Sequence, residues 1–240
     1  MGSRLQPVMA ARRIHSGHRR NQSQRASSSA VRCAEQLSWT SPSSAYVHIP
    51  FCRQKCRYCD FTVHAIGTGP KSGAINDAMS AYARTVCAEI IATAGAVRRR
   101  PTALHTVYVG GGTPSLLPAP LLGAILSQLD SSFGIAAGAE ITVEADPATF
   151  DSQTLVNLAS LGVNRLSVGV QAFSDPLLQS VGRTHSVQDI HRSLRCVQGS
   201  SSFSGSWSLD LLFGLPRQSL EDWERSLELA VAADPSHIAT

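Results

Sequence analysis

The stretch AYVHIPFCRQKCRYCDF, residues 45–61, joins a short apolar run to three closely spaced cysteines. Its first five residues are rich in β-branched and aromatic side chains, which is typical of a β-strand. The cysteines, Cys52, Cys56 and Cys59, follow in the spacing C-x3-C-x2-C, and Phe61 stands two residues after the last of them. The stretch therefore predicts a strand that leads into a loop carrying three thiols.

The same pattern of a β-rich run followed by a helical pattern recurs along the rest of the chain. The predicted strands are 45–49, 105–109, 140–145, 164–170, 207–213 and 237–240. Helical patterns occupy roughly 75–97, 117–131, 151–161, 186–198 and 219–233. This order requires parallel neighbouring strands joined by right-handed crossovers, hence an α/β fold. An open doubly wound sheet and a barrel agree with it equally well.

The last helical pattern is the clearest of the five. Its N-cap is predicted at Ser219, as Asp151 is for the third helix. One face of this helix is expected to carry the apolar side chains Leu220, Trp223, Leu227, Ala230 and Val231.

Nearly every predicted strand ends in an unusual group of residues. The first runs into the cysteine loop, and the next four end in GGGTP (110–114), EADP (144–147), Gln171 and Asp210. In parallel α/β folds the loops at the carboxyl ends of the strands converge on one face, where the chemistry collects. The endings therefore favour a barrel or half-barrel with a single site.

Bulk composition excludes two classes of function. Apolar residues make up 43% of the 240, yet no apolar run approaches the length of a membrane-spanning helix. Seven of the 21 basic residues lie in residues 1–33, which leaves 14 against 17 acidic residues in the rest. The folded part is therefore slightly acidic, which removes the electrostatic argument for nucleic-acid binding.

Residues 1–44 are rich in Arg, Ser, Gln and Ala, and their only acidic residue is Glu35. This composition cannot bury enough apolar surface to fold, and it lacks the apolar run of a secretory signal. We interpret it as a transit peptide to a chloroplast or a mitochondrion; a disordered tail on a cytoplasmic protein is the alternative. The folded domain is predicted over 45–240.

Three cysteines within eight residues are a poor layout for disulfides and a natural one for metal or cluster ligation. Four thiolates would saturate a zinc ion or a [4Fe-4S] cluster, whereas three leave one coordination position open for a small molecule. A zinc site completed by His48 or His64 is the alternative, although it explains neither the glycines nor the other strand endings.

The sequence resembles the radical S-adenosylmethionine (SAM) family in its cysteine loop with Tyr58 before the last cysteine. The runs VYVGGGTPSLL, ITVEADP, GVNRLSVGVQAFSDPLL, VGRTH and DLLFGLPRQSLEDW extend the resemblance over 45–240. Together they resemble the branch that contains oxygen-independent coproporphyrinogen III oxidase and the heme chaperone HemW. This implies a partial (β/α)6 barrel with the C-terminal part of the family fold missing, because family members continue well past residue 240.

The resemblance also implies a set of ligands and the residues that would hold them. Cys52, Cys56 and Cys59 would ligate the cluster, whose open iron would chelate SAM for reductive cleavage to a 5′-deoxyadenosyl radical. Tyr46 would lie beside the cluster. The other implied cofactor-binding residues are Tyr58, Gly111, Gly112, Thr113, Glu144, Gln171, Arg183 and Asp210.

Purely structural roles are open for several of these residues. Glu144 could form a structural salt bridge with Arg165, and Arg183 could cap a helix. The glycines could form an ordinary tight turn.

Phe61 discriminates within the branch. The oxidase pattern has a fourth cysteine at this position, associated with its decarboxylase chemistry, so the sequence resembles the heme chaperones more than the oxidase of porphyrin biosynthesis. The implied partners are heme or a porphyrin, a hemoprotein that receives it, and a reductant for the cluster.

Overall fold

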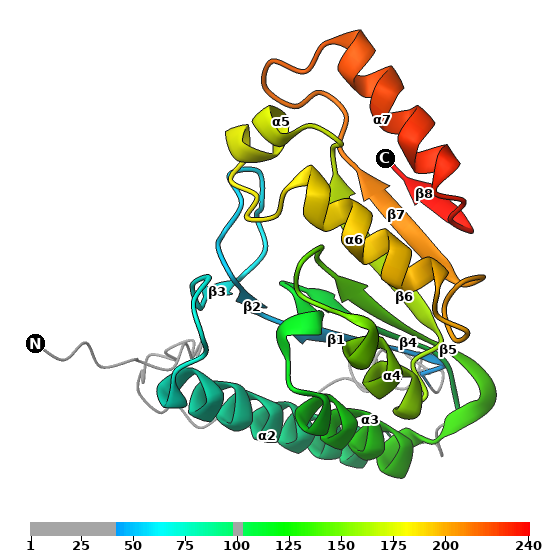
Figure 1. Cartoon of the computed structure of the whole chain (residues 1–240). Coiled ribbons are helices and arrows are strands. Elements are labelled where there is room, and N and C mark those ends of the chain that lie inside the picture. Colours follow the sequence, from blue (N-terminus) through cyan, green and yellow to red (C-terminus); the bar gives the residue numbers. More distant parts are fainter. Residues whose placement is uncertain (1–41, 98–102) are drawn as a thin grey trace, which may run out of the picture. The chain divides into compact units, whose positions relative to one another are not determined.

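The computed structural model describes residues 42–97 and 103–240 (Figure 1). All but the last three positions of the predicted leader lie outside these residues. The described residues belong to the compact unit Thr40–Thr240. None of their helices is both long and apolar enough to cross a lipid bilayer.

Six parallel strands form the main sheet in the order β1 (Ser44–Ile49), β4 (Leu104–Gly111), β5 (Ile135–Ala145), β6 (Arg165–Gln171), β7 (Trp207–Leu211) and β8 (His237–Ala239). Two short strands, β2 (Phe51–Cys52) and β3 (His64–Ala65), pair separately beside the cysteine loop. The order of the six strands follows the chain without a reversal. All six predicted strands are therefore confirmed.

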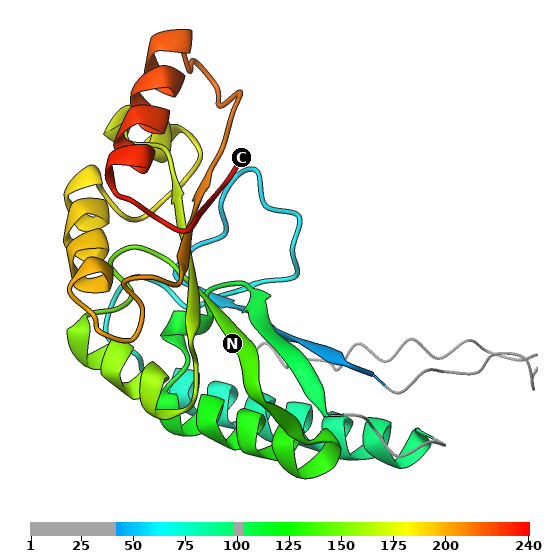
Figure 2. The same ribbon diagram turned by 90° about the vertical axis from the view of Figure 1, so that its right-hand side faces the viewer.

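The helices are α2 (Gly73–Ala96), α3 (Ala119–Phe133), α4 (Ser152–Ser160), α5 (Asp175–Ser180), α6 (Val187–Gln198) and α7 (Leu220–Ala232), with the 3-10 helix η1 (Pro114–Leu116). Figure 2 shows the long helices along one face of the curved sheet. A doubly wound sheet has helices on both faces. The structure therefore decides between the two predicted architectures in favour of the partial barrel.

Side-chain alternation along the strands separates the core from the site. On β5 and β6 the apolar Val143, Leu166 and Val168 are fully buried among the core residues. Their sequence neighbours, which include Glu144 and Ser167, point to the other face because successive side chains of a strand alternate. The polar face is the one that the helices leave open, so it is free to line a site.

Local signals fix where the helices begin. Asp151 accepts a hydrogen bond from the Thr154 amide at the start of α4, and Ser219 forms a reciprocal capping box with Asp222 at the start of α7. Both predicted N-caps are confirmed. Such caps satisfy amide groups that have no partner within the helix.

The predicted apolar face of α7 needs a correction. Leu220 and Val231 are 62% and 66% exposed, whereas the predicted Ala230 is buried and the predicted Trp223 and Leu227 pack against the core. Ser226, which was not predicted, is also buried, so the buried face is shifted away from Leu220 and Val231. The short elements α5, η1, β2 and β3 were not predicted from the sequence.

Candidate functional site

A pocket of about 200 Å³ lies where the carboxyl ends of the strands meet. The sheet register aligns Ile49 with Gly111 and Gly169 with Asp210, which brings these ends to one edge. The predicted site residues that line the pocket are Cys52, Cys56, Tyr58, Cys59, Gly111, Gly112, Thr113, Glu144, Gln171, Arg183 and Asp210. Ten residues from five strand endings thus share one cavity with Arg183, which lies between α5 and α6.

Tyr46 is the predicted site residue that does not line this pocket. Its ring is 58% exposed and stacks on Tyr108 at 6.1 Å between centroids, and its hydroxyl contacts His48 Nδ1 at 3.1 Å. His48 in turn packs edge-on against Phe61, which does line the pocket. Tyr46 is therefore separated from the cysteine loop by the His48 ring.

The cysteine loop is anchored by the residues between its cysteines. Arg53 donates to the Ala148 carbonyl at 2.8 Å, Gln54 to the Gly182 carbonyl at 3.2 Å and Arg57 to the Ser180 carbonyl at 2.9 Å. These bonds join the loop to the segment that follows β5 and to the C-terminal end of α5 with the residues just after it. The loop conformation is thus held by protein contacts that do not involve a thiol.

Two thiols receive hydrogen bonds from the pocket wall. Thr113 Oγ1 donates to Cys52 Sγ at 3.5 Å, and Arg183 Nη1 donates to Cys56 Sγ at 3.5 Å. Burial raises the pKa of the Cys52 thiol, and the Thr113 hydrogen bond offsets only part of that rise. Hydrogen-bond donors aimed at sulfur stabilise the thiolate form, which is the form that binds metal.

The glycines after β4 allow main chain to approach main chain. A Cβ on Gly112 would lie 2.7 Å from the Ile49 carbonyl oxygen, and Gly111 has a φ of 107° with the His48 ring beside it. The Gly111 amide donates to Glu144 Oε2 at 2.9 Å, while Tyr108 donates to Oε1 at 2.8 Å. The glycines are therefore more than an ordinary tight turn, because they hold Glu144 in the pocket.

Glu144 does not form an ion pair with Arg165, which was the structural alternative that the sequence allowed. Arg165 lies 4.0 Å from Glu140 instead. Burial raises the pKa of Glu144, and the hydrogen bonds from Tyr108 and Gly111 offset part of the rise. A second carboxylate, Asp210, also has a raised pKa because of burial, and accepts from Ser167 at 3.1 Å. Two half-buried carboxylates on one pocket give it an affinity for cationic groups.

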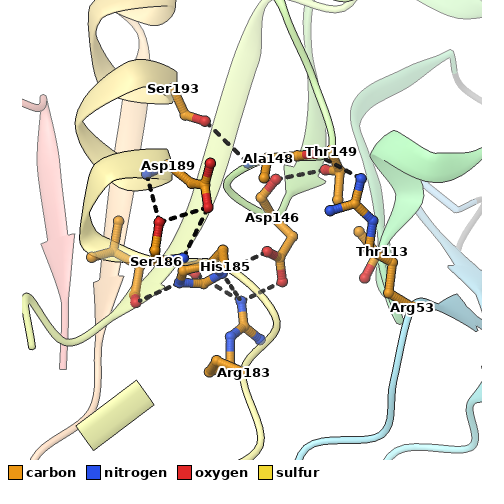
Figure 3. Close-up of polar contacts among 12 residues, drawn as sticks. Arg53, Thr113, Asp146, Ala148, Thr149, Arg183, His185, Ser186, Asp189 and Ser193 are labelled. Atoms are coloured by element: carbon orange, nitrogen blue, oxygen red, sulfur yellow. Dashed lines mark hydrogen bonds and ion pairs between the residues drawn. The ribbon is translucent and has the colours of Figure 1, made fainter. Parts of the chain in front are cut away.

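Arg183 is buried and bonded on several sides, so it is not a helix cap (Figure 3). It forms an ion pair with Asp146 and donates to the Gly169 carbonyl at 2.9 Å and to the Tyr58 hydroxyl at 3.2 Å. Burial lowers the pKa of Arg183, but the surrounding Asp146, Tyr58 and Cys56 raise it above its ordinary value. Arg183 therefore remains cationic beside the cysteine loop.

Gln171 ends β6 in an unusual backbone conformation. Its φ is 69°, in the left-handed region that non-glycine residues rarely adopt. Gly169, two residues earlier, leaves room for the Gln171 amide, since a Cβ there would approach its Nε2 to 2.9 Å. The local backbone thus directs a polar side chain into the pocket at the cost of an unfavourable dihedral angle.

These residues fit a cluster cofactor better than a single metal ion. In the described ranges 42–97 and 103–240, no three Cys, His, Asp or Glu side chains converge as ligands of one ion. A cubane cluster accepts cysteines at wider separations. Two of the loop's sulfurs also accept hydrogen bonds from the pocket wall, and hydrogen bonds to sulfur are typical of cluster sites. Both nitrogens of His48 already contact other groups, Tyr46 and the Thr62 carbonyl.

The sequence did not assign a role to Asp146 or to His185. Asp146 bridges Arg183 and His185. Its Oδ1 lies 2.8 Å from Nδ1 of His185, and it forms the ion pair with Arg183. Both residues stand in motifs that were singled out, EADP and VGRTH. The signal was thus present, but only the fold shows that the two side chains touch.

The comparisons with known proteins agree with this architecture. The sequence model of the Radical SAM superfamily matches residues 46–230. The solved structure of coproporphyrinogen III oxidase (HemN) from Escherichia coli, a radical SAM enzyme, is similar to this one. The sequence identity is 28% and the TM-score is 0.70. The matched region is 83% of this chain and 44% of that one.

Curated relatives include several heme chaperones. The heme chaperone HemW of Synechocystis sp. is 46% identical over 198 residues, which are 82% of this chain and 46% of that protein. HemW of Escherichia coli is 38% identical, over 82% of this chain and 50% of that protein. The mitochondrial radical S-adenosyl methionine domain-containing protein 1 of Mus musculus is 34% identical. The match covers 83% of this chain and 44% of that protein. The chain thus spans about half the length of these relatives.

Proposed function

This chain belongs to the radical SAM superfamily, and from that premise we propose that it is the radical SAM part of a HemW-like heme chaperone. Membership implies a [4Fe-4S] cluster and SAM as cofactors. The similarity to HemW proteins extends the proposal to heme as cargo, a hemoprotein as recipient and a reductant for the cluster.

The proposal assigns roles to the residues of the pocket. Cys52, Cys56 and Cys59 hold the cluster, which when bound supplies an electron for reductive cleavage of SAM. Gly111 and Gly112 let the main chain approach the methionine part of SAM, because no Cβ intervenes. The remaining polar side chains orient SAM through hydrogen bonds and charge: Tyr58, Thr113, Glu144, Gln171, Arg183 and Asp210. Tyr46 contributes from outside the pocket through His48.

Phe61 is the observation that carries the choice of a chaperone over an oxidase. Its ring lines the pocket beside the cysteines and is 56% exposed. In the oxidase pattern a thiol stands at this position. A phenyl ring supplies neither a proton nor a nucleophile, so decarboxylation that depends on that thiol is not supported here.

Anaerobic reconstitution of the full chain with iron and sulfide tests the proposal. We expect about four iron and four labile sulfide per chain, heme binding in an absorbance titration, and no decarboxylation of coproporphyrinogen III. Cys56→Ala should lose the cluster, because the two remaining thiols cannot hold it. The matched control is Cys196→Ala, which removes a cysteine on α6, outside the loop.

Three other outcomes contradict the proposal in different ways. Bound zinc without sulfide would establish the alternative reading of the cysteine loop, a zinc-stabilised interaction module in place of a cluster site. Turnover of coproporphyrinogen III, increased further in Phe61→Cys, would establish the oxidase. A cluster without any binding of heme would leave the superfamily assignment intact and refute the chaperone role of this part of the chain.

We also propose that residues 1–44 direct the protein to an organelle and that 45–240 form its radical SAM domain. The arginine-rich, acid-poor composition of the leader supports this, and relatives in Mus musculus and Bos taurus carry the description mitochondrial. A chloroplast and a mitochondrion are the two destinations that the composition suits.

A further inference from the structure

We propose that His185 is a positioning residue that, through Asp146, holds the Arg183 guanidinium against the cysteine loop and so raises the reduction potential of the cluster. The inference rests on the proposed function, since it requires a cluster on Cys56. It concerns His185 and Asp146, neither of which was assigned a role at the site. Figure 3 shows the three side chains in contact.

The first step is the contact between Arg183 and the loop. Arg183 Nη1 reaches Cys56 Sγ at 3.5 Å and the Tyr58 hydroxyl at 3.2 Å. A cation that donates a hydrogen bond to a ligand sulfur stabilises the reduced cluster, which carries one more negative charge. Any change that turns this guanidinium away should therefore lower the potential.

The second step is that Asp146 orients the guanidinium. It is the carboxylate partner of Arg183 among the described residues, and Arg183 Nε is buried there without a hydrogen-bond partner. The guanidinium is thus held at its outer nitrogens. Besides the contacts of Nη1 with the cysteine loop, Nη2 pairs with Asp146, donates to the Gly169 carbonyl at 2.9 Å and lies 3.5 Å from His185 Nδ1. Its direction depends on where the Asp146 carboxylate stands.

The third step is that His185 fixes Asp146. The His185 side chain is fully buried, and its Nδ1 lies 2.8 Å from Asp146 Oδ1 while Nε2 lies 3.3 Å from the Val170 carbonyl. His185 immediately precedes Ser186, the N-cap of α6, so the capping box of that helix fixes its backbone. The rigid His185 ring lies between the Asp146 carboxylate and the Val170 carbonyl, and it is therefore suited to stop the Asp146 carboxylate from rotating.

A buried histidine with only a packing role would make a different prediction. Its replacement would then lower stability without moving the potential. Two isosteric variants separate these roles, because the asparagine amide nitrogen can stand where Nδ1 stands and that of glutamine where Nε2 stands. His185→Asn keeps a donor toward Asp146, whereas His185→Gln keeps only the contact with Val170.

The experiment is an EPR-monitored dithionite titration of the reconstituted full chain without SAM, with iron and sulfide measured in each sample. We expect His185→Gln and Asp146→Asn to shift the equilibrium toward the oxidised cluster about tenfold, a fall of about 59 mV for one electron. His185→Asn should retain the wild-type potential. Ser193→Ala is the matched control, because Ser193 bonds the Ala148 amide nearby without touching Arg183.

A wild-type potential in His185→Gln and in Asp146→Asn, at full cluster content, would overturn the positioning role. An equal fall in Ser193→Ala would assign the shift to general destabilisation and also overturn it. If one variant fails to fold in a thermal melt, the other carries the test. Absence of labile sulfide from the wild type would instead refute the proposed function, and this inference with it.

Discussion

Gly112 lies where the main chain after β4 closely approaches the main chain that leads into the cysteine loop. Its amide donates to the Ile49 carbonyl at 2.8 Å, and a Cβ would meet that oxygen at 2.7 Å and the Phe51 carbonyl at 2.9 Å. Gly112→Ala should therefore lower the free energy of unfolding by about 1–3 kcal/mol. It should also lower the iron content after reconstitution, because Cys52 directly follows the displaced segment. Chemical denaturation and iron analysis check both effects.

The control for this substitution is Gly205→Ala. Gly205 has no atom near the position of an added Cβ, and its φ is not positive. If both variants lose the same stability and the same iron, close main-chain contact at Gly112 is not the cause.

At the scale of single residues, the sequence predicts the contents of the pocket better than the contacts within it. Cys52, Glu144 and Asp210 could be assigned to one site because each lies near the carboxyl end of a predicted strand, and parallel strands bring their ends together. The bridge between Asp146 and His185 joins residues 39 apart through side-chain packing. No local pattern encodes such a contact, nor the stacking of Tyr46 on Tyr108.

Helix α4 offers a test of how one element is stabilised. Asp151 accepts hydrogen bonds from the Thr154 amide and hydroxyl, both at 2.8 Å, and these lower the pKa of Asp151. Its stabilisation is therefore present above the unfolded-state pKa and is lost as the pH falls through the lower folded-state pKa. Asp151→Ala should reduce the free energy of unfolding by about 1 kcal/mol at neutral pH.

Asp151→Asn separates capping from charge, because asparagine caps helices without titrating. The stability difference between wild type and Asp151→Asn should shrink as the pH is lowered through the range in which Asp151 titrates. Urea denaturation at a series of pH values measures it. A difference that is constant down to strongly acidic pH would show that the carboxylate charge contributes nothing.

At the scale of elements, the long helices and the six main strands were predictable because each carries a repeated pattern over many residues. Helix α5, Asp175–Ser180, is too short to show a period. The burial of Ser226 on α7 could not be predicted, because a small polar residue gives no hydrophobic signal.

At the scale of the whole molecule, alternation of strands and helices predicts a parallel sheet but not its closure. Open and closed sheets use the same βαβ unit and differ in which face each helix covers. Here the strand order from β1 to β8 follows the chain, and the helices stay on one face. That choice depends on the packing of helices against one another, which is a property of the assembled domain.

The proposed leader predicts how the intact chain behaves at an organelle. Seven arginines without an acidic residue in residues 1–33 should be drawn inward by a membrane potential, by about 2.3 kcal/mol per charge per 100 mV. The full chain, offered to isolated mitochondria and to isolated chloroplasts, should enter one of them and become shorter and protease-resistant. A variant with the seven arginines replaced by glutamine should stay outside, because it keeps the length and polarity but not the charge.

If uptake is lost when the membrane potential is dissipated, the destination is the mitochondrion. Uptake of the variant equal to that of the wild type, or exclusion of the full chain from both organelles, would refute the targeting role.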